Sequence, residues 1–443
     1  MRAWLFERIG VPAGAAYFRE DFAARIRALE QSQWDDPGVV ALRQLDRLRA
    51  LVAHARAKVP LYRDLYKDLR PEDLRSLEDA RLLPPVTKEM LRDAYPERVA
   101  AEGTPAGDRI PNSTSGSTGT PLPFFMSRAL LASKAARYFR GNVWAGARPG
   151  ERIYQIWGKQ EGGALRRAFI RHVAGRVNRS AFEMDERTMA RYVEEILVMK
   201  PRILEAYTSA AHALARYLRD AGVPRLPVGA AVTSGETLAD ATRALVAERV
   251  APVWNRYGSR EFGAIAHECE AHDGLHVHAE SFLLEAADPR GKSLTGEPGR
   301  LLVTCFDNVS QPFIRYEIGD VAILEPPGRC PCGRGLPRLR EIQGRMVDLI
   351  VNPDGQVISV HYLTLLFEDY SACVRRFQAV QTAPDALEIL LIPSGRIPPE
   401  TLGELGRKVE AHAGPRMRVT LRPVEDIPAG PDGKRRLMKR AIP

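Results

Sequence analysis

The segment Ile203-Leu-Glu-Ala-Tyr207, followed by Pro227-Val-Gly-Ala-Ala-Val-Thr233 and Pro252-Val-Trp-Asn-Arg-Tyr257, decides the fold class. Each is a short apolar run typical of a buried strand, and helical patterns at 210–221 and 236–250 separate them. Strands that alternate with helices of this length predict βαβ units in a doubly wound, mostly parallel sheet. Ligands of such sheets bind beyond the carboxyl ends of the strands, so the residues that follow these strands are the first candidates for a site.

The same pattern extends upstream. A strand is expected at 152–157 and helices at 129–145 and 186–199, while the part before residue 110 is mostly helical in pattern. We therefore predict an α/β fold with a large N-terminal domain at 1–343, whose first part, 1–110, is helical.

The pattern changes after Gly274, where strands are expected at 275–286 and 300–305. Beyond a Cys/Gly/Pro/Arg-rich stretch we expect a small α+β C-terminal domain at 344–443. Its predicted elements are a hairpin at 348–359, a helix at 361–368, two further strands, a helix at 399–412 and a strand at 417–424.

Composition narrows the class of protein. The 443 residues are 45% hydrophobic and 27% charged, which is ordinary for a globular protein, and their number favours two to four domains. No apolar run is long enough to span a bilayer, and the first eight residues lack the apolar core of a signal peptide. We expect a cytoplasmic protein.

The net charge is +9, and the basic residues are spread along the chain apart from a cluster at 434–440. Such a charge attracts a small polyanion as readily as a nucleic acid. Because the sequence has no interleaved basic and aromatic stripe and no helix-turn-helix signal, we expect no nucleic-acid partner. The oligomeric state is not predicted.

A phosphate-binding loop is the first candidate site. The stretch Asn112-Ser-Thr-Ser-Gly-Ser-Thr-Gly-Thr-Pro121-Leu-Pro123 concentrates hydroxyl side chains and glycines, which can cradle phosphate oxygens with backbone N–H groups. It matches neither the G-x-x-x-x-G-K-[ST] nor the G-x-G-x-x-G pattern. The alternative is a flexible Ser/Gly linker.

Charged residues follow in four turns. In Tyr257-Gly-Ser-Arg-Glu261, the carboxylate after a strand could hold Mg²⁺ against phosphate oxygens, although a lone Glu is more often a surface residue. In Arg315-Tyr-Glu-Ile-Gly-Asp320, the Asp could accept ribose hydroxyls or simply form a turn. Gly344-Arg345-Met-Val-Asp348 and Gly433-Lys434-Arg435 would each, alone, be a charged loop.

A second candidate site contains sulfur ligands. Cys269, His276, Cys330 and Cys332 supply three thiolates and one imidazole, the ligand set of a closed tetrahedral zinc site, with His272 as an alternative fourth ligand. The alternative is that these are free cysteines.

Taken together and in this order, these motifs resemble the adenylate-forming (AMP-binding, ANL) superfamily and, within it, the phenylacetate-CoA ligase and CapK-like branch. Val59-Pro-Leu-Tyr-Arg63 and Leu83-Pro-Pro-Val-Thr-Lys88 are similar to the N-terminal signatures of that branch. The resemblance spans roughly Leu51 to Lys434.

The resemblance implies a role for each motif. Glu261 would carry Mg²⁺, Lys434 would meet the acyl-phosphate in the first half-reaction, Arg345 would assist at the ribose, and the small domain would turn about Asp348. The residues that would contact ATP are Ser113, Thr114, Ser115, Gly116, Ser117, Thr118, Gly119, Thr120, Gly235, Glu236, Thr237, Asn255, Arg256, Tyr257, Gly258, Asp320 and Arg345. The Cys/His set would hold a structural zinc ion, as in many members of the branch.

The implied reaction activates a carboxylic acid with ATP and Mg²⁺ as an acyl-adenylate, releases pyrophosphate and passes the acyl group to CoA. The alternatives are transfer to an amine, a hydroxyl or a carrier-protein thiol, or a nucleotide-binding protein without catalysis. Tyr138, Trp157, Tyr207 and Thr208 would suit an aromatic or otherwise flat acid, or would be plain core.

The sequence also departs from the family. Thr120-Pro121 stands where many relatives have Lys-Pro, and Val347 stands where phenylacetate-CoA ligases have an Asp. The first departure removes one expected phosphate contact from the loop.

Overall fold

The computed structural model describes most of the chain. The described residues are 4, 6–114, 121–148, 150–158, 175–181, 184–288, 290–345, 349–353, 357–359, 363, 366–367, 370, 373–428 and 437–441. Among them, no helix is both long enough and apolar enough to cross a bilayer.

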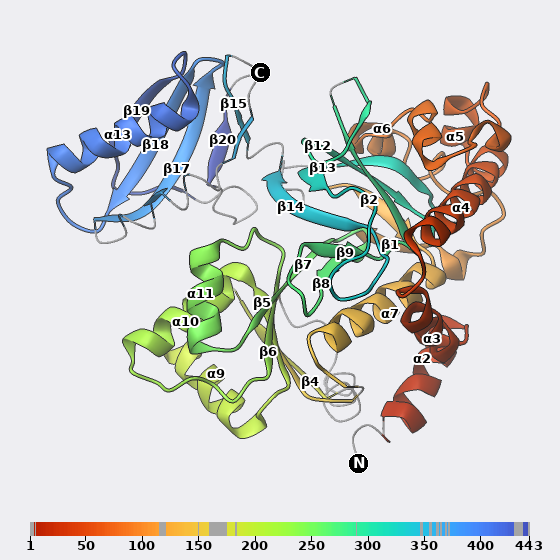
Figure 1. Cartoon of the computed structure of the whole chain (residues 1–443), viewed down its shortest axis with the longest axis horizontal. Helices are drawn as coiled ribbons and strands as arrows, with labels where there is room; N and C mark the ends of the chain where they lie inside the picture. Colours follow the sequence, from red (N-terminus) through yellow and green to blue (C-terminus); the bar gives the residue numbers. More distant parts are fainter. Residues whose placement is uncertain are drawn as a thin grey trace. The chain divides into compact units, whose positions relative to one another are not determined.

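Two compact units make up the chain, and each is described by itself (Figure 1). The larger unit comprises Met1–Thr114, Leu122–Ile318 and Ile323–Glu341. The smaller unit comprises Ser115–Pro121, Gly319–Ala322 and Ile342–Pro443.

The N-terminal part of the larger unit is helical, as predicted. Its elements are the π-helical turn η1 (Phe6–Gly10), the helices α2 (Val11–Phe18), α3 (Phe22–Ser32), α4 (Pro37–Lys58), α5 (Pro60–Leu65) and α6 (Lys88–Asp93), and the 3₁₀ turns η2 (Pro71–Asp73), η3 (Leu77–Leu82) and η4 (Ala106–Asp108).

A hairpin and alternating elements follow. They are β1 (Ile110–Ser113), β2 (Pro123–Met126), α7 (Arg128–Trp144), β3 (Ile153–Trp157), β4 (Arg176–Ser180), α9 (Glu186–Met199), β5 (Ile203–Tyr207), α10 (Thr208–Asp220), β6 (Ala230–Ser234), α11 (Asp240–Arg249) and β7 (Val253–Ser259). The strand predicted at 227–233 begins later because the N–H groups of both Gly229 and Ala230 bond to the carbonyl of Arg202.

Local chemistry sets the ends of α9. The Asp185 side chain accepts a hydrogen bond from the Thr188 N–H and caps the first turn. The buried residues Met189, Tyr192 and Val193 recur at helical spacing. Lys200 adopts a left-handed conformation with φ 48°, which ends the helix before Pro201.

Parallel pairing joins β4, β3, β5, β6 and β7, in that order. Leu204 and Ala206 of β5 pack on the face that α9, α10 and α11 cover (Figure 1). Ile203 belongs to a separate core cluster with Ala145, which follows α7. Apolar residues of β5 thus serve cores on both faces of the sheet, as expected for buried parallel strands.

The remaining strands extend the same sheet with antiparallel pairs. They are β8 (Gly263–Glu268), β9 (Leu275–Val277), β10 (Phe282–Ala287), β11 (Ser293–Leu294), β12 (Pro298–Cys305), β13 (Phe313–Leu324) and β14 (Arg338–Arg345). Among the described residues the sheet has twelve strands in the order β11-β10-β12-β13-β14-β9-β8-β7-β6-β5-β3-β4. The α/β class is confirmed, and the pairs β10–β11, β10–β12, β14–β9, β7–β8 and β8–β9 are antiparallel.

Two predictions for this half were wrong. The strand expected at 275–286 is two strands, because the Ser281 and Phe282 N–H groups turn back to the carbonyl of His278. Asp320 does not follow an isolated turn, since β13 runs through Gly319, which adopts φ 91° inside the strand.

The smaller unit is a compact α+β arrangement. Its elements are the hairpin β15 (Leu349–Val351) and β16 (Val357–Ser359), the strands β17 (Val374–Ala383) and β18 (Ala386–Pro393), the helix α13 (Pro399–Ala413), and the strands β19 (Arg418–Pro423) and β20 (Met438–Arg440). The strand order is β19-β18-β17-β20. Most of the helix predicted at 361–368, and the hinge predicted at Asp348, lie outside the described residues.

An ion pair lies in the core of the larger unit. The side chains of Arg137 on α7 and Asp307 after β12 are 0% and 2% exposed, and their charged atoms are 3.0 Å apart. Arg137 also donates to the hydroxyls of Ser133 and Ser281. A buried pair of this kind persists because hydrogen bonds compensate for the lost hydration of both charges.

We expect Arg137→Met to lower the free energy of unfolding of the larger unit by about 3–5 kcal/mol, because it leaves the Asp307 carboxylate buried without its fully buried cationic partner. Urea denaturation followed by circular dichroism measures this. The control is Arg43→Met, which removes the exposed pair with Asp35 and should cost less than about 1 kcal/mol. Equal losses in the two variants would contradict the prediction.

Candidate active site and metal centre

The stem of the predicted phosphate loop is an antiparallel hairpin in which Ser113 on β1 faces Pro123 on β2. Thr114 closes it: its N–H donates to the carbonyl of Leu122 at 3.0 Å, and its hydroxyl accepts the Leu122 N–H at 2.9 Å. The hairpin thus fixes where the loop leaves and rejoins the fold. Ser115 to Thr120 lie outside the described residues.

Glu261 lies in the tight turn between β7 and β8. The turn depends on two glycines: a Cβ on Gly258 would lie 2.4 Å from the carbonyl oxygen of Gly263, and Gly263 itself has φ 69°. The Glu261 side chain is buried, and its Oε1 accepts a hydrogen bond of 3.0 Å from the Tyr316 hydroxyl on β13. Within the described part of the chain, no hydrogen bond reaches its Oε2.

Two cationic side chains of α7 donate hydrogen bonds to the backbone of this turn. Lys134 donates from Nζ to the carbonyls of Arg260 at 2.9 Å and Glu261 at 3.2 Å. Arg137 donates to the carbonyls of Phe262 at 2.7 Å and Ala264 at 3.0 Å. Burial and the neighbouring Arg137 lower the pKa of Lys134 to about 8.

The other residues predicted to border the nucleotide follow β6 and lie on β7. Gly235 has φ 84°, and a Cβ there would lie 2.9 Å from the Tyr207 ring. Glu236 does not begin α11 as predicted, because its carboxylate accepts both the N–H and the hydroxyl of Ser209 at the start of α10. Thr237 is exposed.

On β7, the Asn255 N–H donates to the Glu268 carboxylate at 2.7 Å. Tyr257 and Gly258 are half-buried residues of the same strand, and the β7–β8 register shifts between them. These two residues therefore lie beside an irregularity in the sheet, next to the turn that carries Glu261.

The predicted acid pocket contains a buried charge cluster that the sequence did not indicate. Glu205 on β5 is fully buried and pairs with the Arg256 guanidinium, and it accepts a hydrogen bond from the Tyr138 hydroxyl. Burial favours the neutral acid, but the Arg256 and Arg176 guanidiniums outweigh it and lower the pKa of Glu205. Burial also raises the pKa of Tyr138 to about 12.

Aromatic rings accompany this charge cluster. Trp157 at the end of β3 stacks on Tyr207 at the end of β5, with ring centroids 4.2 Å apart. The Arg256 guanidinium lies 5.0 Å from the Tyr138 ring and 5.8 Å from the Trp157 ring. The Thr208 hydroxyl donates to the Glu236 carbonyl. Trp157, Tyr207 and Thr208 therefore lie at or just after the carboxyl ends of β3 and β5. Tyr138 on α7 instead contacts Glu205 in the middle of β5.

The remaining predicted site residues are Asp320, Arg345 and Lys434. Asp320 is a half-buried residue of β13, the strand that also carries Tyr316. Arg345 ends β14, and its side chain lies outside the described part, as does all of Lys434. The roles of these three residues stay predictions.

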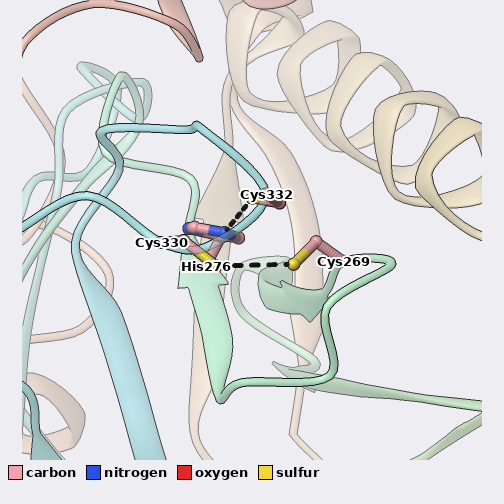
Figure 2. A group of neighbouring side chains, drawn as sticks. All are labelled: Cys269, His276, Cys330 and Cys332. Atoms are coloured by element: carbon pink, nitrogen blue, oxygen red, sulfur yellow. Dashed lines mark hydrogen bonds between the residues drawn. The ribbon is translucent and has the colours of Figure 1, made fainter.

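The Cys/His residues converge (Figure 2). One ligand atom from each of Cys269, His276, Cys330 and Cys332 lies within 4.8 Å of the others. The sulfurs of Cys269 and Cys330 are 3.8 Å apart, and His276 Nε2 lies 3.3 Å from the Cys332 sulfur. The residues come from the end of β8, from β9 and from the loop between β13 and β14.

Hydrogen bonding orients the imidazole for a ligand. His276 Nδ1 donates to the carbonyl of Leu336 at 3.3 Å, which leaves Nε2 directed at the cluster. Burial lowers the pKa of His276 to about 4, so the ring is neutral at physiological pH. Burial also raises the pKa of the Cys269 thiol to about 12 in the absence of a cation. His272 is not in the cluster: it pairs with Glu268 at 3.2 Å and lies against the Trp254 ring.

Arg334, which follows the Cys-x-Cys pair, anchors the cluster to the helical part. Its guanidinium donates to Gln33 at 2.8 Å and to both oxygens of Glu270. It lies between the rings of Trp34 and Trp144, 4.7 and 4.8 Å from their centroids. The loop that carries Cys330 and Cys332 is thus held independently of any metal.

Sequence reasoning missed Lys134, Tyr316 and Glu205. Lys134 is one of several charged residues on a predicted helix, and nothing local marks it as buried. Tyr316 lies in the motif Arg315-Tyr-Glu-Ile-Gly-Asp320, in which only Asp320 was predicted to have a role. Glu205 carries a signal that could have been used, because a charged residue in the middle of an apolar strand implies a buried partner.

Comparisons with known proteins support the family resemblance. The CapK C-terminal domain model matches residues 350–441. A phenylacetate-coenzyme A ligase of Thermus thermophilus is 28% identical over 429 residues, covering 89% of this chain and 94% of that ligase. Protein CapK of Staphylococcus aureus is 24% identical over 367 residues, covering 80% of this chain and 78% of CapK.

A solved structure has the same fold. A 2-hydroxyisobutyryl-CoA ligase in its postadenylation state aligns with a TM-score of 0.69 at 24% identity, covering 89% of this chain and 88% of that one. The order of the motifs, the sheet and the sequence relatives all agree. The chain is similar to the adenylate-forming superfamily, in the branch that contains the phenylacetate-CoA ligases and CapK.

Proposed function

We propose that the chain is an ATP-dependent acid–CoA ligase that makes an acyl-adenylate and then a thioester. The observation that carries this proposal is the hydrogen bond between the loop stem and the Glu261 turn, in which Arg260 Nε donates to the side-chain oxygen of Asn112 at 3.3 Å. It joins a loop suited to phosphates with a carboxylate suited to a divalent cation, which is the pairing that nucleotide chemistry needs.

In the first half-reaction, an oxygen of the substrate carboxylate attacks the α-phosphorus of ATP, and the bond to the β-phosphate oxygen breaks. Pyrophosphate leaves and the acyl-adenylate remains. Positioning and charge neutralisation supply most of the rate enhancement in such transfers. Here Lys134 and Arg137 fix the backbone from Arg260 to Ala264, so the Glu261 carboxylate is positioned before any ligand binds.

Glu261 fits the role of a Mg²⁺ ligand. Its Oε1 is oriented by Tyr316, while Oε2 has no hydrogen-bond donor among the described residues. Mg²⁺ prefers one or two carboxylates together with substrate phosphate oxygens. When bound, the ion would neutralise phosphate charge.

For the second half-reaction we propose that the CoA thiolate attacks the carbonyl carbon of the adenylate, so that the C–S bond forms and AMP leaves. Trp157 and Tyr207 support an aromatic or otherwise flat acid, because their rings stack at the ends of neighbouring strands. The Tyr138 ring lies near the same Arg256 guanidinium as the Trp157 ring. An amine, a hydroxyl or a carrier-protein thiol is the second candidate acceptor, which the match to the CapK C-terminal domain permits. Acid-dependent pyrophosphate release is common to these acceptors, and acceptor-dependent AMP release distinguishes them.

We also propose that Asp320 and Arg345 bind the ribose, that Lys434 contacts the acyl-phosphate, and that the small domain turns about Asp348. These roles rest on the order of the motifs. A Cys/His cluster with one imidazole oriented by a carbonyl supports a structural zinc ion, with Cys269, His276, Cys330 and Cys332 as its ligands.

We expect Glu261→Gln to lower acid- and ATP-dependent pyrophosphate release about 10²–10³-fold, because an amide keeps the Tyr316 contact but has no charge to hold Mg²⁺. A panel of aryl and short-chain acids, assayed with and without CoA, provides the measurement. The exposed Glu297→Gln is the matched control and should keep wild-type activity. Equal rates in Glu261→Gln and the wild type would remove Glu261 from the site.

Lys434→Ala tests the C-terminal assignment. We expect adenylate formation to fall at least tenfold, because a point charge near the α-phosphate is lost. The rate of CoA transfer from a supplied acyl-adenylate should change much less, since that step needs no new bond to phosphorus. Unimpaired adenylate formation would contradict the assignment.

Metal analysis tests the zinc proposal. Freshly purified protein should contain about one equivalent of zinc, and Cys330→Ser should lose it together with thermal stability, because a thiolate ligand is removed. Cys373→Ser is the control, since that half-buried thiol lies outside the cluster and donates to the Tyr370 carbonyl. Well under one equivalent in the wild type would exclude the site.

A further inference from the structure

The guanidinium of Arg260 is exposed at the point where the loop stem meets the Glu261 turn. Its Nε donates to the Asn112 side-chain oxygen, and the same oxygen accepts the Ser113 N–H at 2.8 Å. Asn112 therefore fixes the direction of the Arg260 side chain relative to the strand that leads into the loop. Arg260 lies at the base of that loop and directly precedes Glu261.

The rest of the Arg260 guanidinium is available. In the part of the chain that the structure describes, Arg260 forms no ion pair, and its Nη1 and Nη2 atoms make no hydrogen bond. A guanidinium has five N–H donors in a planar fork, and only Nε is engaged here. The two terminal nitrogens are the pair that binds phosphate oxygens in a bidentate manner.

The surroundings carry excess positive charge. Lys134 lies under the same turn, where its ammonium group donates to two backbone carbonyls and forms no ion pair with a carboxylate of the described residues. Burial, Arg137 and Arg260 all lower its pKa, while Glu261 acts in the opposite direction. Lys134 and Arg260 thus place two positive charges beside the single carboxylate of Glu261, and this excess favours an anionic ligand such as a phosphate.

The sequence of the loop explains why a cation is needed here. Thr120 stands where many members of the family have lysine, so the loop itself has no positive side chain from Asn112 to Pro123. We propose that Arg260 supplies the cation that binds the phosphates of ATP in this protein, in place of the lysine that the loop lacks. This inference rests on the proposed ATP-dependent function and names a residue and a contact that it does not include.

A purely structural role for Arg260 makes a different prediction. If its only task were to tie the loop stem to the turn through Asn112, then loss of the Nε hydrogen bond would matter and the charge would not. Arg260→Lys keeps the charge and removes the Nε bond, whereas Arg260→Gln removes both. A lysine at position 120 restores the charge from another backbone position without restoring the bond to Asn112.

Calorimetric titration of the full chain with ATP and Mg²⁺ tests the proposal. We expect Arg260→Gln to weaken ATP binding about 10- to 100-fold, as for loss of a charge-assisted hydrogen bond. Arg260→Lys should retain most of the affinity, and Thr120→Lys in the Arg260→Gln background should recover at least half of the loss in free energy. Arg219→Gln, which removes an exposed guanidinium beside Asp220, is the control and should bind ATP like the wild type.

Adenosine, which has no phosphate, is the second probe, and its affinity should be unchanged in Arg260→Gln. The proposal is overturned if ATP affinity is unchanged in that variant, if adenosine affinity falls as much as ATP affinity, if Thr120→Lys restores nothing, or if the wild type binds no ATP. Acid-dependent pyrophosphate release by the wild type is measured alongside. If ATP binding follows the expected pattern without that release, the ligase function fails while the role of Arg260 stands.

Discussion

The candidate active site depends on the hydrogen bonds by which side chains of α7 fix the turn after β7. Lys134 and Arg137 are neighbours on one face of the helix, and their side chains together donate to four successive or nearly successive carbonyls, those of Arg260, Glu261, Phe262 and Ala264. Backbone carbonyls in a tight turn have no sheet partner, so a cation is an effective way to satisfy them when they are buried. These hydrogen bonds therefore fix the position of the turn and the orientation of the Glu261 side chain.

The two cations differ in how their charge is balanced. Arg137 is compensated by Asp307, which also receives a hydrogen bond from Arg47, so this ion pair forms part of a satisfied buried network. Within the described part of the chain Lys134 forms no ion pair, and burial, followed by the nearby Arg137, lowers its pKa. An uncompensated cation costs free energy in a fold and persists where it serves a ligand, which agrees with an anionic substrate at this turn.

The two N-terminal signatures, at 59–63 and 83–88, contact β13 and so position this strand. The Tyr62 hydroxyl donates to the carbonyl of Pro312 and accepts the Ile314 N–H, and Val86 pairs with Tyr316 through two backbone hydrogen bonds on either side of that residue. Tyr316 in turn donates to Glu261. Short motifs far from the site in sequence therefore act on it through one strand. The Cys/His cluster has a comparable effect at the antiparallel centre of the sheet, where it joins the end of β8 to β9 and to the loop before β14.

The sequence by itself determined the parallel strands β3, β5, β6 and β7 but not β4, together with the helices between them and the identity of most candidate residues. The bounds of α9 and β5 follow from an N-cap, apolar spacing and a Pro, all of which are local. The Cys-x-Cys pair and the glycines around Glu261 are local signals as well.

Only the tertiary structure decided what depends on distant partners. The strands β8, β13 and β14 contain charged residues that look like loops until Arg315 is seen bonded to Glu285 and to the carbonyl of Leu83. The choice of His276 over His272 and the burial of Lys134 beneath Glu261 were fixed in the same way. His276 contacts Cys332, 56 positions away, and Lys134 contacts Glu261, 127 positions away, and hydrogen bonds between residues so far apart leave no periodic trace in the sequence.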